Sequence, residues 1–101
     1  MRAVIMDSKD NVATLFNNVS AGDEVTVVSS KNEVLKKIIL PQSILAGHKF
    51  ALNDITEKSE IIKYGEVIGY ATKSIKKNEY VHIHNMQSGK ILKKEYMNKN
   101  D

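Results

Sequence analysis

The sequence predicts a mainly β domain with one short helix near its N-terminus. Short runs in which apolar and polar residues alternate, such as residues 24–29 and 49–55, indicate strands with one buried face. A turn pattern that occurs three times indicates that the strands are joined by tight connections. A chain of 101 residues has the size of one domain.

The first half of the chain contains the predicted helix. A strand over residues 2–6 precedes it, and the helix covers residues 11–18, with Asp10 as a suitable N-cap. Its apolar residues follow the i, i+3, i+4, i+7 spacing of one helical face; they are Val12, Leu15, Phe16 and Val19. Strands follow over residues 24–29 and 33–40. The last run also has some helical spacing, but its β-branched end favours a strand.

The second half of the chain reads as short strands only. Pro41 ends the preceding strand, and residues 41–47 connect it to the strand at residues 49–55. A turn at residues 64–66 separates two apolar pairs, and Gly69 indicates a bulge or a close backbone approach. The last predicted strand covers residues 80–84, and residues 88–101 form a polar C-terminal tail.

The recurring turn pattern has apolar residues at its first and seventh positions. It starts at Val19, Ile55 and Ile75, and its fourth residues are Gly22, Lys58 and Asn78. We expect that fourth residue to adopt a left-handed conformation, which Gly and Asn tolerate and Lys fits least well.

Composition excludes several classes of function. The chain has no cysteine, which excludes disulfides and thiolate metal sites and suits a cytoplasmic protein. Its 15 basic and 12 acidic residues are scattered, without interleaved aromatic residues, so no nucleic-acid partner is expected. The apolar run at the N-terminus is too short for a signal-peptide core or a membrane span, so no membrane partner is expected either.

The histidines are the clearest candidates for chemistry. In a strand over residues 80–84, His82 and His84 emerge on one face while Val81 and Ile83 face the core. His48, at the start of an earlier strand, is a possible third member of the cluster. Imidazoles bind metals and exchange protons near neutral pH, although a strand bearing two histidines is often only a polar surface.

Several short motifs also occur in a fixed order. After residue 46 they are GHK at 47–49, Asp54-Ile55, KYGE at 63–66, IGYAT at 68–72 and VHIHN at 81–85. With DNVAT at 10–14 and AGD at 21–23, this ordered set resembles the N-terminal SAF domain of the altronate and galactarate dehydratase family. The resemblance implies a SAF-type β-clip fold over residues 1–87. It also implies that the chain is the small subunit of a sugar-acid hydro-lyase, in which a separate, larger chain contains most of the catalytic groups.

Such a reaction removes a proton beside a carboxylate and expels hydroxide from the neighbouring carbon. A divalent, iron-like metal ion can assist both steps, and its candidate ligands are His48, His82 and His84, or two of them with a ligand from another chain. Lys49, Lys63 and Tyr64 are candidates for binding the carboxylate of a sugar-acid substrate. The residue types do not assign catalytic residues.

A second function class stays open. The same domain type resembles antifreeze-like, sialic acid synthase and pilus or flagellar assembly domains, so the chain could be a non-catalytic carbohydrate-binding or assembly module. In that case the lysines and Tyr64 are solvated surface residues. The histidine cluster favours the dehydratase subunit, because an assembly module has no need of three imidazoles. The oligomeric state, including a homo-oligomer, is open.

Overall fold

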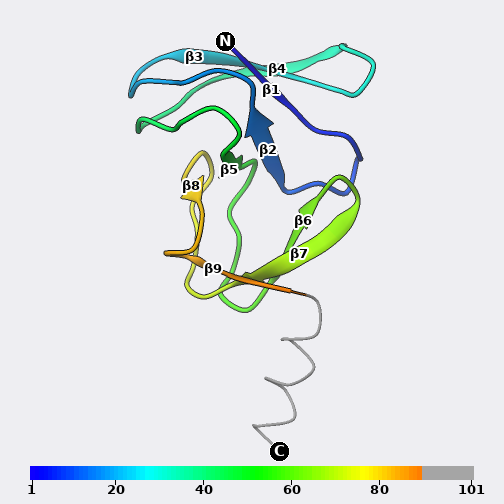
Figure 1. Ribbon diagram of the computed structural model, residues 1–101, viewed down its shortest axis with the longest axis vertical. Helices are drawn as coiled ribbons and strands as arrows, with labels where there is room; N and C mark the ends of the chain where they lie inside the picture. The colour runs from blue at the N-terminus through cyan, green and yellow to red at the C-terminus, as the bar shows by residue number, and fades with distance from the viewer. Residues whose placement is uncertain (90–101) are drawn as a thin grey trace, which may run out of the picture.

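The computed structural model describes residues 1–89, which contain nine strands and no helix (Figure 1). The strands are β1 (Arg2–Val4), β2 (Val12–Leu15), β3 (Glu24–Val28), β4 (Val34–Ile39), β5 (Lys49–Ala51), β6 (Glu60–Lys63), β7 (Glu66–Ala71), β8 (Tyr80–Val81) and β9 (Met86–Ser88). The prediction of a mainly β domain is therefore confirmed. Most of the predicted polar tail, residues 90–101, lies outside the described residues.

The strands form two sheets. The larger sheet has six strands in the order β4-β3-β1-β2-β5-β8, and the smaller has three in the order β6-β7-β9. Within the described residues, β1 and β3 are parallel and every other strand pair is antiparallel. The small sheet lies beside β2 and below the far end of the large sheet in Figure 1. β8 is therefore an edge strand of the large sheet, close to the place where the two sheets meet.

Two apolar cores lie on opposite faces of β2, β5 and β8, which are neighbouring strands at one end of the large sheet. Along β2 and β5, Ala13 and Phe50 belong to the first core, whereas their neighbours Val12 and Ala51 belong to the second. In β8, Tyr80 packs against the first core and Val81 is buried in the second. Successive strand residues point to opposite faces, so three short strands can separate two cores.

The predicted helix over residues 11–18 is wrong, because this segment contains β2 in the interior of the large sheet. All four residues of β2 are buried, and they pair with both β1 and β5. A strand covered on both faces needs apolar residues at successive positions and does not alternate. The helical spacing of Val12, Leu15 and Phe16 is therefore coincidental, and Phe16 is in fact exposed.

The recurring turn is confirmed. Gly22, Lys58 and Asn78 have φ angles of 91°, 74° and 70°, which lie in the left-handed region. The structure adds a fourth copy that starts at Ile44, with Gly47 at its fourth position (φ 85°). In every copy the backbone N–H of the fifth residue donates to the carbonyl of the second; in this fourth copy His48 donates to Leu45 over 3.1 Å. Single bridges join the copies in pairs, Val19 to Ile44 and Ile55 to Ile75.

Gly69 confirms the other backbone prediction. It lies in β7 opposite Ser88 of β9, and a Cβ atom added to it would lie 2.2 Å from the carbonyl oxygen of Gln87. A register shift in the β6–β7 pair occurs at the same level of the hairpin. Only glycine allows the two backbones to approach this closely. Within the part of the chain that the structure describes, no helix is long and apolar enough to cross a membrane.

Candidate functional site

The three histidines gather around one aromatic ring, that of Tyr80. The Tyr80 hydroxyl lies 2.7 Å from Nδ1 of His48, at hydrogen-bonding distance. The Tyr80 ring stacks on His82 with centroids 5.7 Å apart and lies 5.4 Å from the ring of His84. His48 and His82 also meet edge to face, with centroids 5.1 Å apart. We call Tyr80 and these three histidines the imidazole cluster.

His48 is positioned by the fourth copy of the recurring turn. Gly47 takes the left-handed conformation at the turn, and its N–H donates to the carbonyl of Leu15 over 2.8 Å. The carbonyl of His48 in turn accepts from the N–H of Leu15 over 2.9 Å. These two bonds join the turn to the buried strand β2. The His48 side chain therefore projects from a backbone that the large sheet holds in place.

His82 and His84 lie on a turn and not on the predicted strand over residues 80–84. β8 ends at Val81, and residues 82–85 form the connection to β9. Ile83, predicted to face the core, is 77% exposed, while Val81 is fully buried as expected. The prediction failed because a single buried side chain reverses the chain after Val81.

That side chain is Asn85, which is completely buried. Its Oδ1 accepts the backbone N–H of His82 over 2.9 Å, and its Nδ2 donates to the carbonyl of Tyr80 over 2.8 Å. Nδ2 also lies 3.3 Å from a carboxylate oxygen of Glu79. The buried amide thus satisfies its own hydrogen bonds with the backbone that enters the turn, and it fixes where His82 and His84 leave that backbone.

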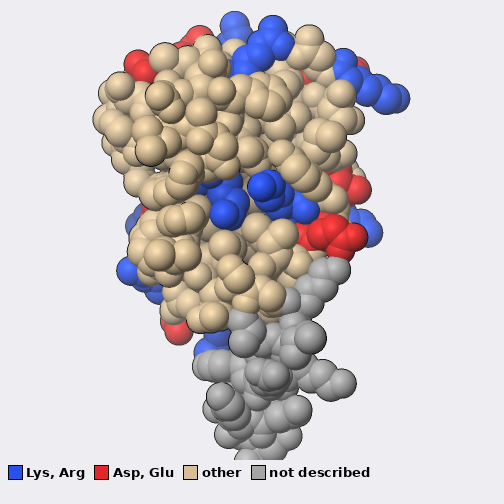
Figure 2. Space-filling model, in the orientation of Figure 1, with Lys and Arg blue, Asp and Glu red and all other residues tan. Residues whose placement is uncertain are grey.

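Lys49 belongs to β5 of the large sheet and Lys63 to β6 of the small sheet, and their ammonium groups lie within electrostatic reach of each other. Burial lowers the pKa of half-buried Lys49, and the positive charge of Lys63 lowers it further. Figure 2 shows basic side chains gathered in the middle of one face of the molecule. Two neighbouring cations, one of them half-buried, are suited to bind an anion.

The pKa of His82 is also lowered. Desolvation is the largest cause, followed by the positive charges of His48, Lys49 and His84. His82 therefore favours its neutral form, the form that accepts a proton or binds a metal. This effect also shows that the imidazole cluster and Lys49 lie within electrostatic reach of each other.

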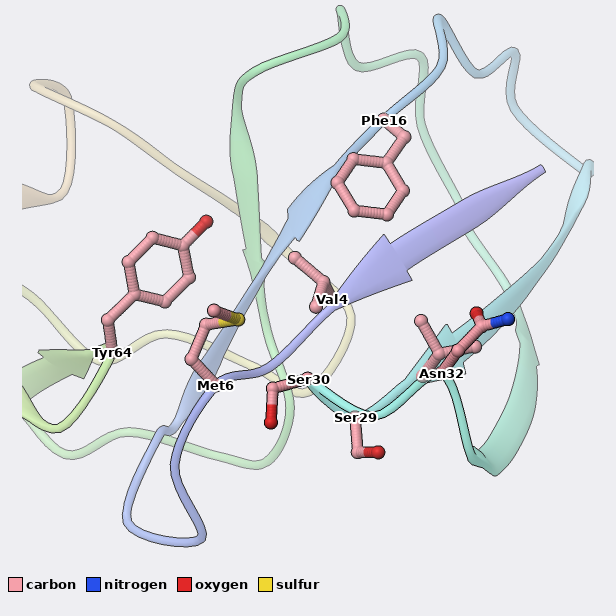
Figure 3. Close-up of a pocket in the computed structure, with 8 residues that line it drawn as sticks. Val4, Met6, Phe16, Ser29, Ser30, Asn32 and Tyr64 are labelled. Carbon is pink, nitrogen blue, oxygen red and sulfur yellow. The ribbon is translucent and has the colours of Figure 1, made fainter.

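Tyr64 belongs to a different surface from the imidazole cluster. It lies at the tip of the β6–β7 hairpin, where Nζ of Lys63 lies 5.1 Å from the centre of its ring. The ring lines a largely apolar hollow of about 360 Å³ together with Val4, Met6 and Phe16 (Figure 3). The structure thus gathers the three predicted histidines around Tyr80. Lys49 and Lys63 lie within electrostatic reach of each other, and Tyr64 lines a separate hollow.

The described residues do not by themselves form a metal site. Among residues 1–89 no group of three or more His, Cys, Asp or Glu side chains is arranged to hold a metal ion. One ring nitrogen of His48 is also occupied by the Tyr80 hydroxyl. Metal binding by His48, His82 and His84 therefore stays a prediction, and it needs at least one ligand from outside residues 1–89.

Two residues of the site were not singled out from the sequence, Tyr80 and Asn85. Both lie next to the histidines in the segment NEYVHIHN at residues 78–85. A signal was present, because tyrosine and asparagine directly flank the segment that contains both histidines. Their roles depend on the turn at 82–85, which the alternation of the sequence conceals.

Comparison with known proteins gives one family match and several relatives. A profile described as the altronate/galactarate dehydratase SAF domain matches residues 1–89. Altronate dehydratase of Escherichia coli is 36% identical over 88 residues, which cover 87% of this chain and 17% of that protein. Galactarate dehydratase (L-threo-forming) of the same organism is 42% identical over 74 residues, covering 71% of this chain and 12% of that protein.

A third relative matches this chain over most of its own length. The (2R)-sulfolactate sulfo-lyase subunit alpha of Chromohalobacter salexigens is 31% identical over 86 residues, which cover 84% of this chain and 92% of that subunit. The chain therefore spans less than a fifth of the two dehydratases but nearly the whole of a lyase subunit.

Proposed function

Because the chain belongs to the altronate/galactarate dehydratase SAF domain family, we propose that it is the small subunit of a sugar-acid hydro-lyase. The match to subunit alpha of the sulfo-lyase carries this proposal, since it pairs a chain of this length with a lyase of more than one subunit. A larger partner chain would supply most of the catalytic groups. The imidazole cluster and the two lysines would lie at the edge of that partner's active site.

The basic site suits the chemistry of a hydroxy acid. When the proton beside a carboxylate is removed, negative charge develops on the carboxylate oxygens, and nearby cations lower the energy of that state. Lys49 and Lys63, which lie within electrostatic reach of each other, would supply these cations. The half-buried position of Lys49 limits water access, which strengthens the attraction.

A divalent, iron-like metal ion stays a prediction for the assembled enzyme. Such an ion would act as a Lewis acid toward the substrate oxygens. The described residues of this chain do not provide three ligands, so the partner chain would have to complete the site. We therefore assign no step of the reaction to a metal.

A second candidate reaction is the elimination of sulfite from a sulfonated hydroxy acid, by analogy with the sulfo-lyase subunit that the chain nearly spans. The two reactions share the removal of a proton beside a carboxylate and differ in the leaving group, hydroxide or sulfite. A pair of lysines suits either substrate, because one can bind the carboxylate and the other a second polar or anionic group.

Reconstitution tests the proposal. The adjacent reading frame should encode a large dehydratase-like chain, and both chains are produced together and assayed with altronate, galactarate and (2R)-sulfolactate. We expect turnover of one of these only when both chains are present. Changing Lys49 to Met should lower kcat/KM by about a hundredfold. The matched control, Lys37→Met on the exposed face of β4, should leave it unchanged.

The histidines provide the second arm of this test. The double variant His82→Ala, His84→Ala should fold normally, because both side chains project from a surface turn, yet should reduce turnover of the complex. Full activity of this double variant, or activity of the small chain alone, contradicts the assignment.

A further inference from the structure

Tyr80 is the residue on which the imidazole cluster converges, and the proposed function leaves it without a role. Its hydroxyl contacts Nδ1 of His48, and its ring stacks on His82 at an interplanar angle of 11°. A tyrosine kept only for packing would not need its hydroxyl at 2.7 Å from an imidazole nitrogen. The contact therefore points to control of His48 by Tyr80.

The Tyr80 hydroxyl is held in place from several sides. Its backbone pairs with Phe50 across β5 and β8, and its carbonyl accepts from the buried amide of Asn85. Its ring packs against the first core. Since His48 leaves a turn that is itself bonded to β2, both partners of the hydrogen bond lie on ordered backbone. The bond is thus built into the fold.

The chemistry of the two groups indicates which of them donates the hydrogen bond. A tyrosine hydroxyl can both donate and accept a hydrogen bond. A neutral imidazole has one nitrogen that donates and one that accepts. Within residues 1–89 the Tyr80 hydroxyl has no other hydrogen-bond partner, so donation to Nδ1 gives its proton an acceptor in the protein. The reverse arrangement would leave the hydroxyl proton to solvent alone.

We propose that Tyr80 is a positioning residue that fixes His48 as the tautomer with its proton on Nε2. In this state Nδ1 is engaged by the hydroxyl and Nε2 presents an N–H group. His48 then acts as a hydrogen-bond donor to an oxygen of the carboxylic-acid substrate and not as a metal ligand. The substrate part of this inference rests on the proposed function, whereas the tautomer does not.

The three imidazoles would then have different roles. His48 contributes a fixed donor, and Lys49 lies within electrostatic reach of the same cluster, since its charge acts on His82. A carboxylate oxygen accepts hydrogen bonds from both kinds of donor, an imidazole N–H and an ammonium group. His82 and His84 lie on the other turn and have no hydrogen bond from a ring nitrogen within the described chain. These two rings are the ones free to accept a proton or to bind an ion.

Nitrogen NMR of the histidine-labelled small chain tests the tautomer without any partner. At pH 8, where imidazoles are neutral, we expect His48 to show a protonated Nε2 and an unprotonated Nδ1. Tyr80→Phe retains the ring but removes the hydroxyl, so it should shift the Nδ1 resonance and mix the two tautomers. The control Tyr64→Phe, at the hairpin tip, should change neither. A proton on Nδ1 in the unaltered chain, or unchanged His48 nitrogens in Tyr80→Phe, would overturn the proposal.

The reconstituted complex tests the substrate part separately. Loss of one oriented donor should raise KM about tenfold in Tyr80→Phe while kcat changes little. If the NMR result holds and KM is unchanged, the role of His48 as a substrate donor is wrong although the tautomer is right. If no substrate is turned over even with the unaltered small chain, the proposed function fails, and the NMR result still decides the tautomer.

Discussion

The two turns that carry the histidines are built in different ways. The turn before His48 depends on the backbone: Gly47 has a φ of 85°, and the same hydrogen-bonded arrangement occurs at three other places in the chain. The turn that carries His82 and His84 depends on one side chain, the buried amide of Asn85. The backbone-determined turn recurs in this fold, and most of its copies carry no histidine. The turn that depends on a buried side chain lies at the candidate site. Substitutions at the two turns should therefore lower the free energy of unfolding by different amounts.

The largest effect is expected for Asn85→Ala. This change removes the acceptor for the His82 N–H and the donor to the Tyr80 carbonyl, and leaves a small cavity in a fully buried place. Unpaired buried polar groups make the expected loss in unfolding free energy about 3 kcal/mol. Urea unfolding measures it, with the exposed residue Asn53 changed to Ala as the control. A loss as small as that of the control would show that the amide does not hold the turn.

A smaller effect is expected for Gly47→Ala. No atom lies within 4 Å of an added Cβ, so the cost comes only from the left-handed backbone. That conformation costs a non-glycine residue about 1–2 kcal/mol. Gly22→Ala, at the same position of another copy and equally open, is the matched control and should lose the same amount.

The two variants should differ in one respect. Only Gly47→Ala should disturb the hydrogen bond between His48 and Tyr80, which nitrogen NMR of His48 detects. A much greater loss of stability at Gly47 than at Gly22 would show that the two turns are not the same device.

The comparison also explains what could be predicted from the sequence. The recurring turn was visible because its apolar anchors keep a fixed spacing, and even Lys58 adopts the expected left-handed φ. The histidines and the two lysines could be chosen as site residues by type. The fourth copy was missed, although Ile44, Gly47 and Phe50 match the pattern.

Other features depend on burial, which the sequence does not display. The sequence of β2 predicts a helix because its apolar residues also fit a helical face, and its position between two cores makes it a strand. Asn85 and Tyr80 are polar or half-polar residues whose importance comes from what surrounds them. Where one buried amide decides the course of the chain, alternation of residue types predicts the wrong element.

The smallest expected effect concerns the pH dependence of stability at His82. Its pKa is lowered in the folded protein, by desolvation first and then by the charges of His48, Lys49 and His84. The unfolded chain, with an ordinary pKa of 6.5, therefore binds a proton at a higher pH than the folded protein does. Above that pH both states are neutral and His82 contributes nothing. As the pH falls below it, the unfolded state takes up the proton first and the unfolding free energy decreases.

Urea unfolding at pH 7.5 and pH 5.5 measures this contribution. The unaltered chain should lose stability at the lower pH, and His82→Gln should lose less, because glutamine cannot take up the proton. At pH 7.5 the two proteins should differ little. An equal loss in both proteins would mean that His82 is not disfavoured in its charged form. His82 would then be no more desolvated in the folded protein than in the unfolded chain, and no more affected by neighbouring positive charges.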